Sequence, residues 1–199
     1  MTDTRGFSLI EVLVSIVVLS FGLLGMVGMQ AASLHANREA RLQSSGVVLA
    51  RELADMIRGD KVVGILTGTA NPYLVSGSGS TLVAATPSYC LSVSATTACA
   101  DNAEIANAEM TDWLARVNAE LPGARVVSCY DSAPFNATTG LPTWNCTAPV
   151  AGATAPIVIK IGWTKSSTNK SNQGANALEY STGNSAAAPS VVLQVTAGI

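Results

Sequence analysis

The most pronounced feature of the hydrophobic pattern is an apolar run near the start of the chain. From Val12 to Met29 no residue is charged, and Val, Leu, Ile, Met or Phe occupies most positions. A helix needs about 18 to 20 such residues to cross roughly 30 Å of hydrocarbon. The run therefore predicts a membrane-spanning helix, whereas the sequence after it is polar enough to be soluble.

Helical periodicity continues beyond the apolar run. Arg58-Gly59 is the expected end of the helix, because glycine suits the left-handed conformation that closes many helices. The pattern thus predicts one helix from about Ser8 to Arg58, with a membrane half and a half that carries a soluble domain. Apolar residues form one stripe along the second half, with most charged residues turned away, at Leu34, Leu42, Leu49, Leu53, Met56 and Ile57.

The segment from Lys61 to Ala100 is rich in Gly, Ser, Thr and Ala and contains several turn signals, including Asn71-Pro72 and Pro87. Such a composition predicts an irregular connection with short strands near Tyr73–Ser76 and Thr81–Ala85. The run from Ser76 to Ser80 (SGSGS) is interpreted as a flexible tip.

A second helix is predicted to begin at Asp101, where Glu104 completes a variant capping box, and to stop at Pro122-Gly123. Its apolar residues repeat at helical spacing at Met110, Trp113, Leu114, Val117 and Leu121.

Three strands follow, and alternation identifies them. The first is Arg125–Tyr130, and the last has Val191, Leu193 and Val195 on one face. In the middle strand one face carries Ile157, Ile159, Ile161 and Trp163, whereas Lys160 and Thr164 point to the other. These strands predict an α+β fold in which an antiparallel sheet packs on the long helix.

Four cysteines lie beyond the apolar run, at Cys90, Cys99, Cys129 and Cys146, and none forms a CxxC pair. An even number of cysteines predicts an oxidising compartment and two disulfides. The pairs Cys90–Cys99 and Cys129–Cys146 are favoured, because the nearer partner closes the shorter loop at a smaller entropic cost. Free buried thiols or a zinc site remain alternatives, although the spacing is not that of zinc ligands.

Composition and charge argue against other classes of function. The 199 residues carry 11 Lys and Arg and 13 Asp and Glu, for a net charge of −2, and the basic residues are scattered. Nucleic-acid binding is therefore not expected. No constellation of acid, base, nucleophile or metal ligands is visible, so neither an enzyme nor a cofactor or metal is expected. His35 is interpreted as a surface or interface residue, and Asp131 as a loop cap, with calcium binding as the alternative.

The first residues carry the strongest candidate for function. A short polar segment, MTDTRG, ends at Gly6, and Phe7 opens the apolar helix FSLIEVLVSIVVLS, whose one acid is Glu11. A carboxylate in an apolar span costs several kcal/mol unless it is neutralised or paired. Glu11 is therefore predicted to be functional, and Ser8 and Ser15 are expected to help satisfy it.

Other interpretations of this segment stay open. An ordinary secretory signal peptide would end at Ala31-Ala32-Ser33, although the apolar run is longer than usual for one. An uncleaved signal anchor would leave Glu11 unexplained. A lipoprotein is excluded, because no cysteine lies near the segment.

The order of residue types from Met1 to Glu11 resembles the class III signal of type IV prepilins and type II secretion pseudopilins: a polar leader ending in Gly, then Phe-Ser-Leu-Ile-Glu. The resemblance implies that prepilin peptidase cuts between Gly6 and Phe7 and methylates the new amino group of Phe7. The best partner for Glu11 is then that amino group on a neighbouring subunit, and the pair would set the axial register of each incoming subunit.

Three further segments, DWLARVNAELPG, VVSCYD and IGWT, resemble PilV-type pilus modification proteins. This resemblance implies a pilin-like fold and a minor pilin of the type IV pilus. Its expected parts are a leader (1–6), a transmembrane and filament-core helix half (7–32), an amphipathic helix half (33–59) and a periplasmic globular head (60–199).

The partners implied are the membrane, prepilin peptidase, the inner-membrane assembly platform, the major pilin and other minor pilins. The expected location is the inner membrane before assembly, with the head in the periplasm, and the pilus at the cell surface afterwards. A type II secretion pseudopilin is the first alternative, and a pilus-borne adhesion or DNA-uptake subunit is the second.

Overall fold

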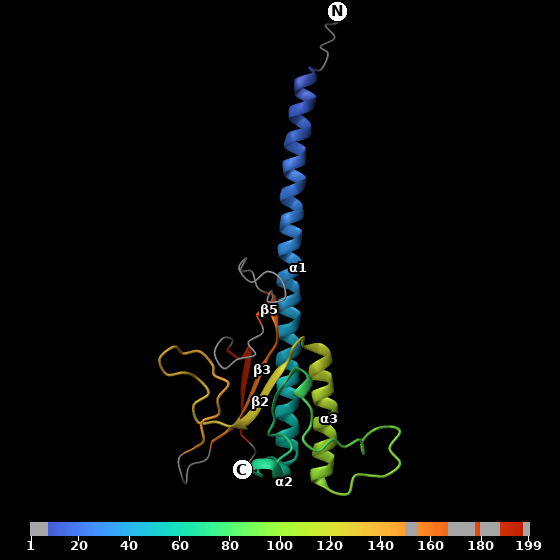
Figure 1. The fold of residues 1–199 in the computed structure, drawn as a ribbon, viewed down its shortest axis with the longest axis vertical. Coiled ribbons are helices and arrows are strands. Elements are labelled where there is room, and N and C mark those ends of the chain that lie inside the picture. Colours follow the sequence, from blue (N-terminus) through green and yellow to red (C-terminus); the bar gives the residue numbers. More distant parts are fainter. Residues whose placement is uncertain (1–7, 150–154, 167–177, 180–187, 197–199) are drawn as a thin grey trace, which may run out of the picture. The chain divides into compact units, whose positions relative to one another are not determined.

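The computed structural model describes residues 8–149, 155–166, 178–179 and 188–196 (Figure 1). The chain divides into two units, residues 1–41 and residues 42–199, and the second is called the head from here on. The leader and the expected cleavage site between Gly6 and Phe7 lie outside the described residues.

Helix α1 runs from Leu9 to Gly59, within one residue of the helix predicted from the sequence. Every residue from Leu9 to Ala32 is exposed, and this helix is long and apolar enough to cross a membrane. The buried face of α1 belongs to the head and includes Leu49, Leu53 and Ile57. The predicted stripe was wrong at Leu34, which is exposed because burial in the head begins only at about residue 42.

Helix α1 ends where the sequence predicted, but the cap at this end differs from the prediction. Gly59 has no left-handed backbone, since the described glycines with positive φ are Gly68, Gly79, Gly123 and Gly140. Instead, the single residue Asp60 separates α1 from a second short helix, α2 (Lys61–Gly64). The Asp60 carboxylate accepts hydrogen bonds from the amides of Val62 and Val63, both at 3.1 Å. An N-cap for the next helix therefore replaces the expected glycine cap.

Four antiparallel strands form the main sheet, in the order β1-β2-β3-β6. The three strands predicted by alternation are all present. The α+β fold class, with a long helix and an antiparallel sheet, is confirmed. The bounds are β1 (Ser76–Ser78), β2 (Arg125–Tyr130), β3 (Ile157–Gly162) and β6 (Val191–Val195), and a separate pair is formed by β4 (Lys165–Ser166) and β5 (Leu178–Glu179).

The connection after α2 was predicted incorrectly in two respects. The strand expected near Tyr73–Ser76 is displaced, because β1 begins only at Ser76, and Thr81–Ala85 is not a strand. The 3₁₀ turns η1 (Gly68–Ala70) and η2 (Gly79–Thr81) lie before and after β1. The supposed flexible tip is largely β1, which pairs with β2 at the edge of the sheet. Residue 77 must be small there, because a Cβ on Gly77 would lie 2.9 Å from the carbonyl oxygen of Thr81.

Helix α3 (Asn102–Glu120) begins as predicted, with the Asp101 carboxylate accepting from the amide of Glu104 at 2.8 Å. The Glu104 carboxylate in turn accepts a hydrogen bond from the amide of Ala100, one residue before the cap, at 2.7 Å. The helix ends before Gly123. The backbone of Gly123 has a φ of 59°, which lies in the left-handed region that glycine adopts easily.

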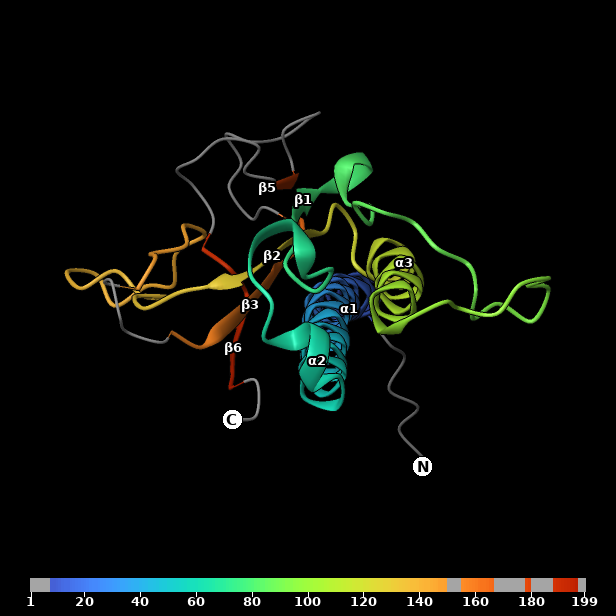
Figure 2. The same ribbon diagram turned by 90° about the horizontal axis from the view of Figure 1, so that it is seen from below.

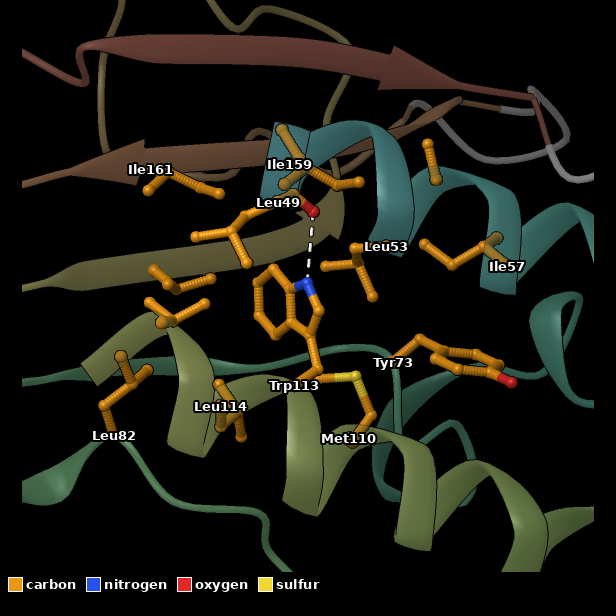
Figure 3. Packing of buried hydrophobic residues seen from close by; sticks show 14 of the residues in the cluster. Leu49, Leu53, Ile57, Tyr73, Leu82, Met110, Trp113, Leu114, Ile159 and Ile161 are labelled. Atoms are coloured by element: carbon orange, nitrogen blue, oxygen red, sulfur yellow. Dashed lines mark hydrogen bonds between the residues drawn. The ribbon is translucent and has the colours of Figure 1, made fainter. Parts of the chain in front are cut away.

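Within the head, α1 lies between the sheet and α3 (Figures 2 and 3). Trp113 of α3 is fully buried in this core, and its indole Nε1 donates a hydrogen bond to the carbonyl of Leu49 at 3.1 Å. Figure 3 shows Ile159 and Ile161 of β3 above Leu49. At the other end of the buried face, Gly46 lets α1 approach the sheet, because a Cβ there would lie 2.7 Å from the ring of Trp163.

Candidate functional site

Glu11 lies in the first turn of α1 and is exposed among apolar residues that are also exposed. Its amide donates to the carbonyl of Ser8 at 3.0 Å, which starts the helix. Among the described residues, no side chain forms a hydrogen bond or ion pair with the Glu11 carboxylate. A negative charge near a helix N-terminus is favourable in itself, because the first turn carries a partial positive charge.

The serines expected to assist Glu11 do not contact its carboxylate. The Ser15 hydroxyl donates to the backbone carbonyl of Glu11 at 2.7 Å, and Ser20 makes the same bond to Ile16. These bonds are the usual way in which a serine inside an apolar helix satisfies its hydroxyl. Any partner that neutralises Glu11 must therefore come from outside the described residues of this chain.

The apolar surface around Glu11 is large and continuous. Side chains along residues 9–29 are exposed on every side of the helix, including Leu13, Val17 and Phe21. Such a helix is stable only when lipid or other apolar helices surround it. The arrangement is one carboxylate near the start of an apolar rod, which is suited to recognising a cation in a medium that excludes water.

In the head, the most heavily buried charges are Asp131 and Lys160. Their side chains are both 0% exposed, and the Lys160 ammonium lies 2.6 Å from the Asp131 carboxylate. The other Asp131 oxygen accepts from the amides of Ala133 at 2.9 Å and Thr147 at 3.0 Å. Burial by itself raises the pKa of Asp131, but the hydrogen bonds from Lys160 and from the two amides lower it below its usual value.

Asp131 therefore acts as the loop cap that the sequence suggested, and its second oxygen accepts from the Lys160 ammonium. No group of three His, Cys, Asp or Glu side chains able to hold a metal is present in the described part of the chain.

The burial of Lys160 was missed in the sequence. Alternation correctly places it on the face of β3 opposite Ile159 and Ile161, but that face is not open to solvent. The loop between Asp131 and Thr147 covers it, and a Cβ on Gly162 would lie 2.9 Å from the Trp144 ring. The only sequence signal was the position of Asp131 directly after a strand that pairs with β3.

Both disulfides join the cysteines that the sequence favoured. Cys129 of β2 bonds to Cys146, across the loop that carries Asn145, whose carbonyl accepts a hydrogen bond from Lys160. Cys90 bonds to Cys99 just before α3. The first disulfide and the buried ion pair therefore hold the same loop against the sheet.

An ion-pair network joins α1 to α3 at the surface. The guanidinium of Arg116 binds both oxygens of Glu52, with one contact at 2.8 Å, and also binds Asp112 at 3.0 Å. Hydrogen bonds to Glu52 are the main cause that raises the pKa of Arg116. Nearby, the buried Tyr73 donates its hydroxyl to Glu109 at 2.9 Å, and burial followed by this contact raises the pKa of the phenol. These contacts tie α3 to α1 and to the segment that carries Tyr73.

Comparison with known protein families identifies the prokaryotic N-terminal methylation motif over residues 1–27. The matched segment contains the Gly6-Phe7 junction, Glu11 and most of the exposed apolar run. Comparison with curated proteins and with solved structures yields no match. The chain thus carries the N-terminal segment of a type IV pilin-like prepilin, followed by an α+β head with two disulfides.

Proposed function

We propose that this protein is a minor pilin of the type IV pilus, which helps to prime or assemble the fibre and thereby supports twitching motility or adhesion. The observation that carries the proposal is Glu11, an acid without a partner among the described residues, at the start of an exposed apolar helix within a methylation motif. The role is structural and involves no catalysis.

The proposed sequence of events begins with cleavage after Gly6 by prepilin peptidase and methylation of Phe7. A secondary ammonium then stands one helical turn before Glu11. In the core of a filament, where apolar helices exclude water, the carboxylate of one subunit pairs with the ammonium of its neighbour. Each partner would be costly to bury alone, so helices shifted out of register are disfavoured.

Before assembly, the same apolar half holds the chain in the inner membrane, and the head faces the periplasm. Two disulfides are consistent with an oxidising compartment for the head. The proposed partners are the major pilin, other minor pilins and the inner-membrane assembly platform.

A type II secretion pseudopilin would carry the same motif. The segments DWLARVNAELPG, VVSCYD and IGWT, which resemble PilV-type proteins, favour the pilus. Comparing piliation and protein secretion in a deletion strain separates the two hypotheses. Loss of surface pili with normal secretion supports the pilus, whereas normal pili with impaired secretion would reassign the protein.

The processing step is tested by mass analysis of the mature N-terminus. We expect a chain that starts at methylated Phe7, and a chain that retains residues 1–6 or starts near Ser33 would refute the proposal. Glu11→Gln tests the pairing, because it keeps the size and polarity of the side chain and removes the charge. We expect normal processing and insertion but reduced recovery in sheared pili, and unchanged recovery would contradict the pairing.

A further inference from the structure

The head exposes a cluster of apolar side chains on the segment 83–100, which precedes α3. No residue between Lys61 and Asp101 is charged. Large apolar side chains that stay exposed close together in the chain are candidates for a binding surface. The large exposed side chains of the segment are Val83, Tyr89, Leu91 and Val93, of which Val93 is fully exposed.

The base of this segment is fixed to α3 while its outer part projects. The amide of Ser88 donates to the Thr111 hydroxyl at 3.1 Å, and the sulfur of Cys90 lies 3.8 Å from the carbonyl oxygen of Glu104. The disulfide between Cys90 and Cys99 closes the loop formed by residues 90–99. Figures 1 and 2 both show the loop extending from α3 on the side away from the sheet.

A disulfide in this position restricts a loop that adds no large side chain to the core. Leu91 and Val93 are exposed, whereas the core side chains nearest in sequence are Ala84 and Ala106. Ordering a loop before it binds reduces the entropy lost on association. The disulfide therefore restricts the loop to fewer conformations, which favours binding through its apolar side chains.

A groove of about 810 Å³ adjoins the loop and runs between the segment 82–92 and α3. Leu82, Leu91 and Ala108 contribute to its apolar part. Its lining also includes the acids Glu52, Glu109 and Asp112 and one base, Arg116, so the charged part is negative overall. The chemistry that complements this surface is a set of apolar side chains with a lysine or arginine beside them.

We infer that the loop 83–100 and the adjoining groove form a docking surface for the head of a neighbouring pilin-type subunit that offers apolar side chains and a basic residue. The inference rests on the proposed function, because a filament places heads side by side. Without a covering surface, Tyr89, Leu91 and Val93 would remain exposed to water.

Photo-crosslinking in the full chain, expressed in its own cells, tests this contact. A benzophenone amino acid replaces Val93, and the same amino acid at Glu120, an exposed position at the end of α3, is the matched control. We expect an adduct with another pilin-type subunit in sheared pili from position 93 only, identified by mass spectrometry. Equal adducts from both positions, or adducts from position 93 with other proteins only, would overturn the inference.

Substitutions give a second readout. Val93→Asp and Leu91→Asp should each reduce recovery in sheared pili about tenfold, because a contact that buries such a side chain is worth about that factor. Thr97→Asp, on the same loop, should have a much smaller effect. If Val93→Asp is recovered as well as Thr97→Asp, the loop is not a docking surface.

The two proposals fail separately. Methylated Phe7 and presence of the unsubstituted chain in sheared pili are measured in the same samples. If both are found but position 93 gives no pilin adduct, only the docking surface is refuted. If neither is found, the minor pilin role is refuted and the docking surface with it.

Discussion

Replacing Asp131 by asparagine tests the buried ion pair. Asp131→Asn keeps the shape of the side chain and an oxygen that can accept from the amides of Ala133 and Thr147. It removes the negative charge 2.6 Å from the Lys160 ammonium, which is 0% exposed. The Asn145 carbonyl would remain as a neutral partner for that ammonium. The substitution thus separates charge from packing.

The expected cost follows from the burial of both groups. Removing one member of a buried pair leaves an uncompensated charge and typically costs about 3 to 5 kcal/mol. For a chain of this size, about 1 kcal/mol corresponds to roughly 2 to 4 °C in Tm, so the expected decrease is roughly 6 to 20 °C. The double variant Asp131→Asn with Lys160→Met should be more stable than Asp131→Asn alone, because it removes the orphaned ammonium.

Thermal unfolding of the full chain in detergent measures these differences. Near-ultraviolet circular dichroism is the appropriate signal, because it reports the packing of Trp113 and the other aromatic residues in the head. Arg116→Gln is the control, since Arg116 and Glu52 are 40% and 36% exposed and such pairs contribute at most about 1 kcal/mol. A decrease for Asp131→Asn no larger than that of the control, or a double variant less stable than the single one, would refute the reasoning.

Two further predictions concern the head. The pKa of the Asp131 carboxyl in the folded head lies below its ordinary value of 3.8. The ionised carboxylate therefore stabilises the fold fully above pH 3.8, and this stabilisation is lost as the pH falls through the lowered pKa. Tm measured between pH 6 and 2 should thus decrease more steeply in the natural chain than in Asp131→Asn. Gly46→Ala should cost about 1 to 3 kcal/mol, since its Cβ would meet the Trp163 ring at 2.7 Å, whereas Gly28→Ala has no such neighbour and should leave the unfolding of the head unchanged.

The elements with strong periodicity could be predicted from the sequence. Helix α3 was predictable because Asp101 supplies a cap and Trp113 and Val117 repeat at helical spacing before Pro122. The strand β3 was predictable because Ile157 and the alternate residues after it face the core. In these segments, local propensity and burial favour the same structure.

The segment after α2 could not be predicted, because contacts distant in sequence determine its structure. Tyr73 is buried through its packing and its bond to Glu109. The chain at Val75 joins the sheet by exchanging backbone hydrogen bonds with Ser128, at 3.2 and 2.7 Å. The Gly-Ser run at residues 76–80 gives no sign of either interaction, and taken alone it predicts a flexible tip.

The candidate site was predictable in part. Glu11 can be singled out from the sequence because it is the one acid in the apolar stretch from Phe7 to Met29, and its role in assembly is a proposal. The role of Asp131 was recognisable only as a loop cap, because nothing in the local sequence shows that Lys160 lies opposite it. Lys160 is buried because another segment covers its face of β3. That segment is the loop that starts at Asp131, directly after β2.

Because Leu49, Leu53 and Ile57 belong to the same helix as the apolar run, the central element of the head is translated before every strand of the sheet that packs on it. Its buried face has no complete cover until β6, which ends at Val195, has been translated. Until then, the apolar face of this helix has no complete intramolecular cover that shields it from water. A secreted soluble version of the head, free of the anchor, would have to retain the helix from about Leu42 onward.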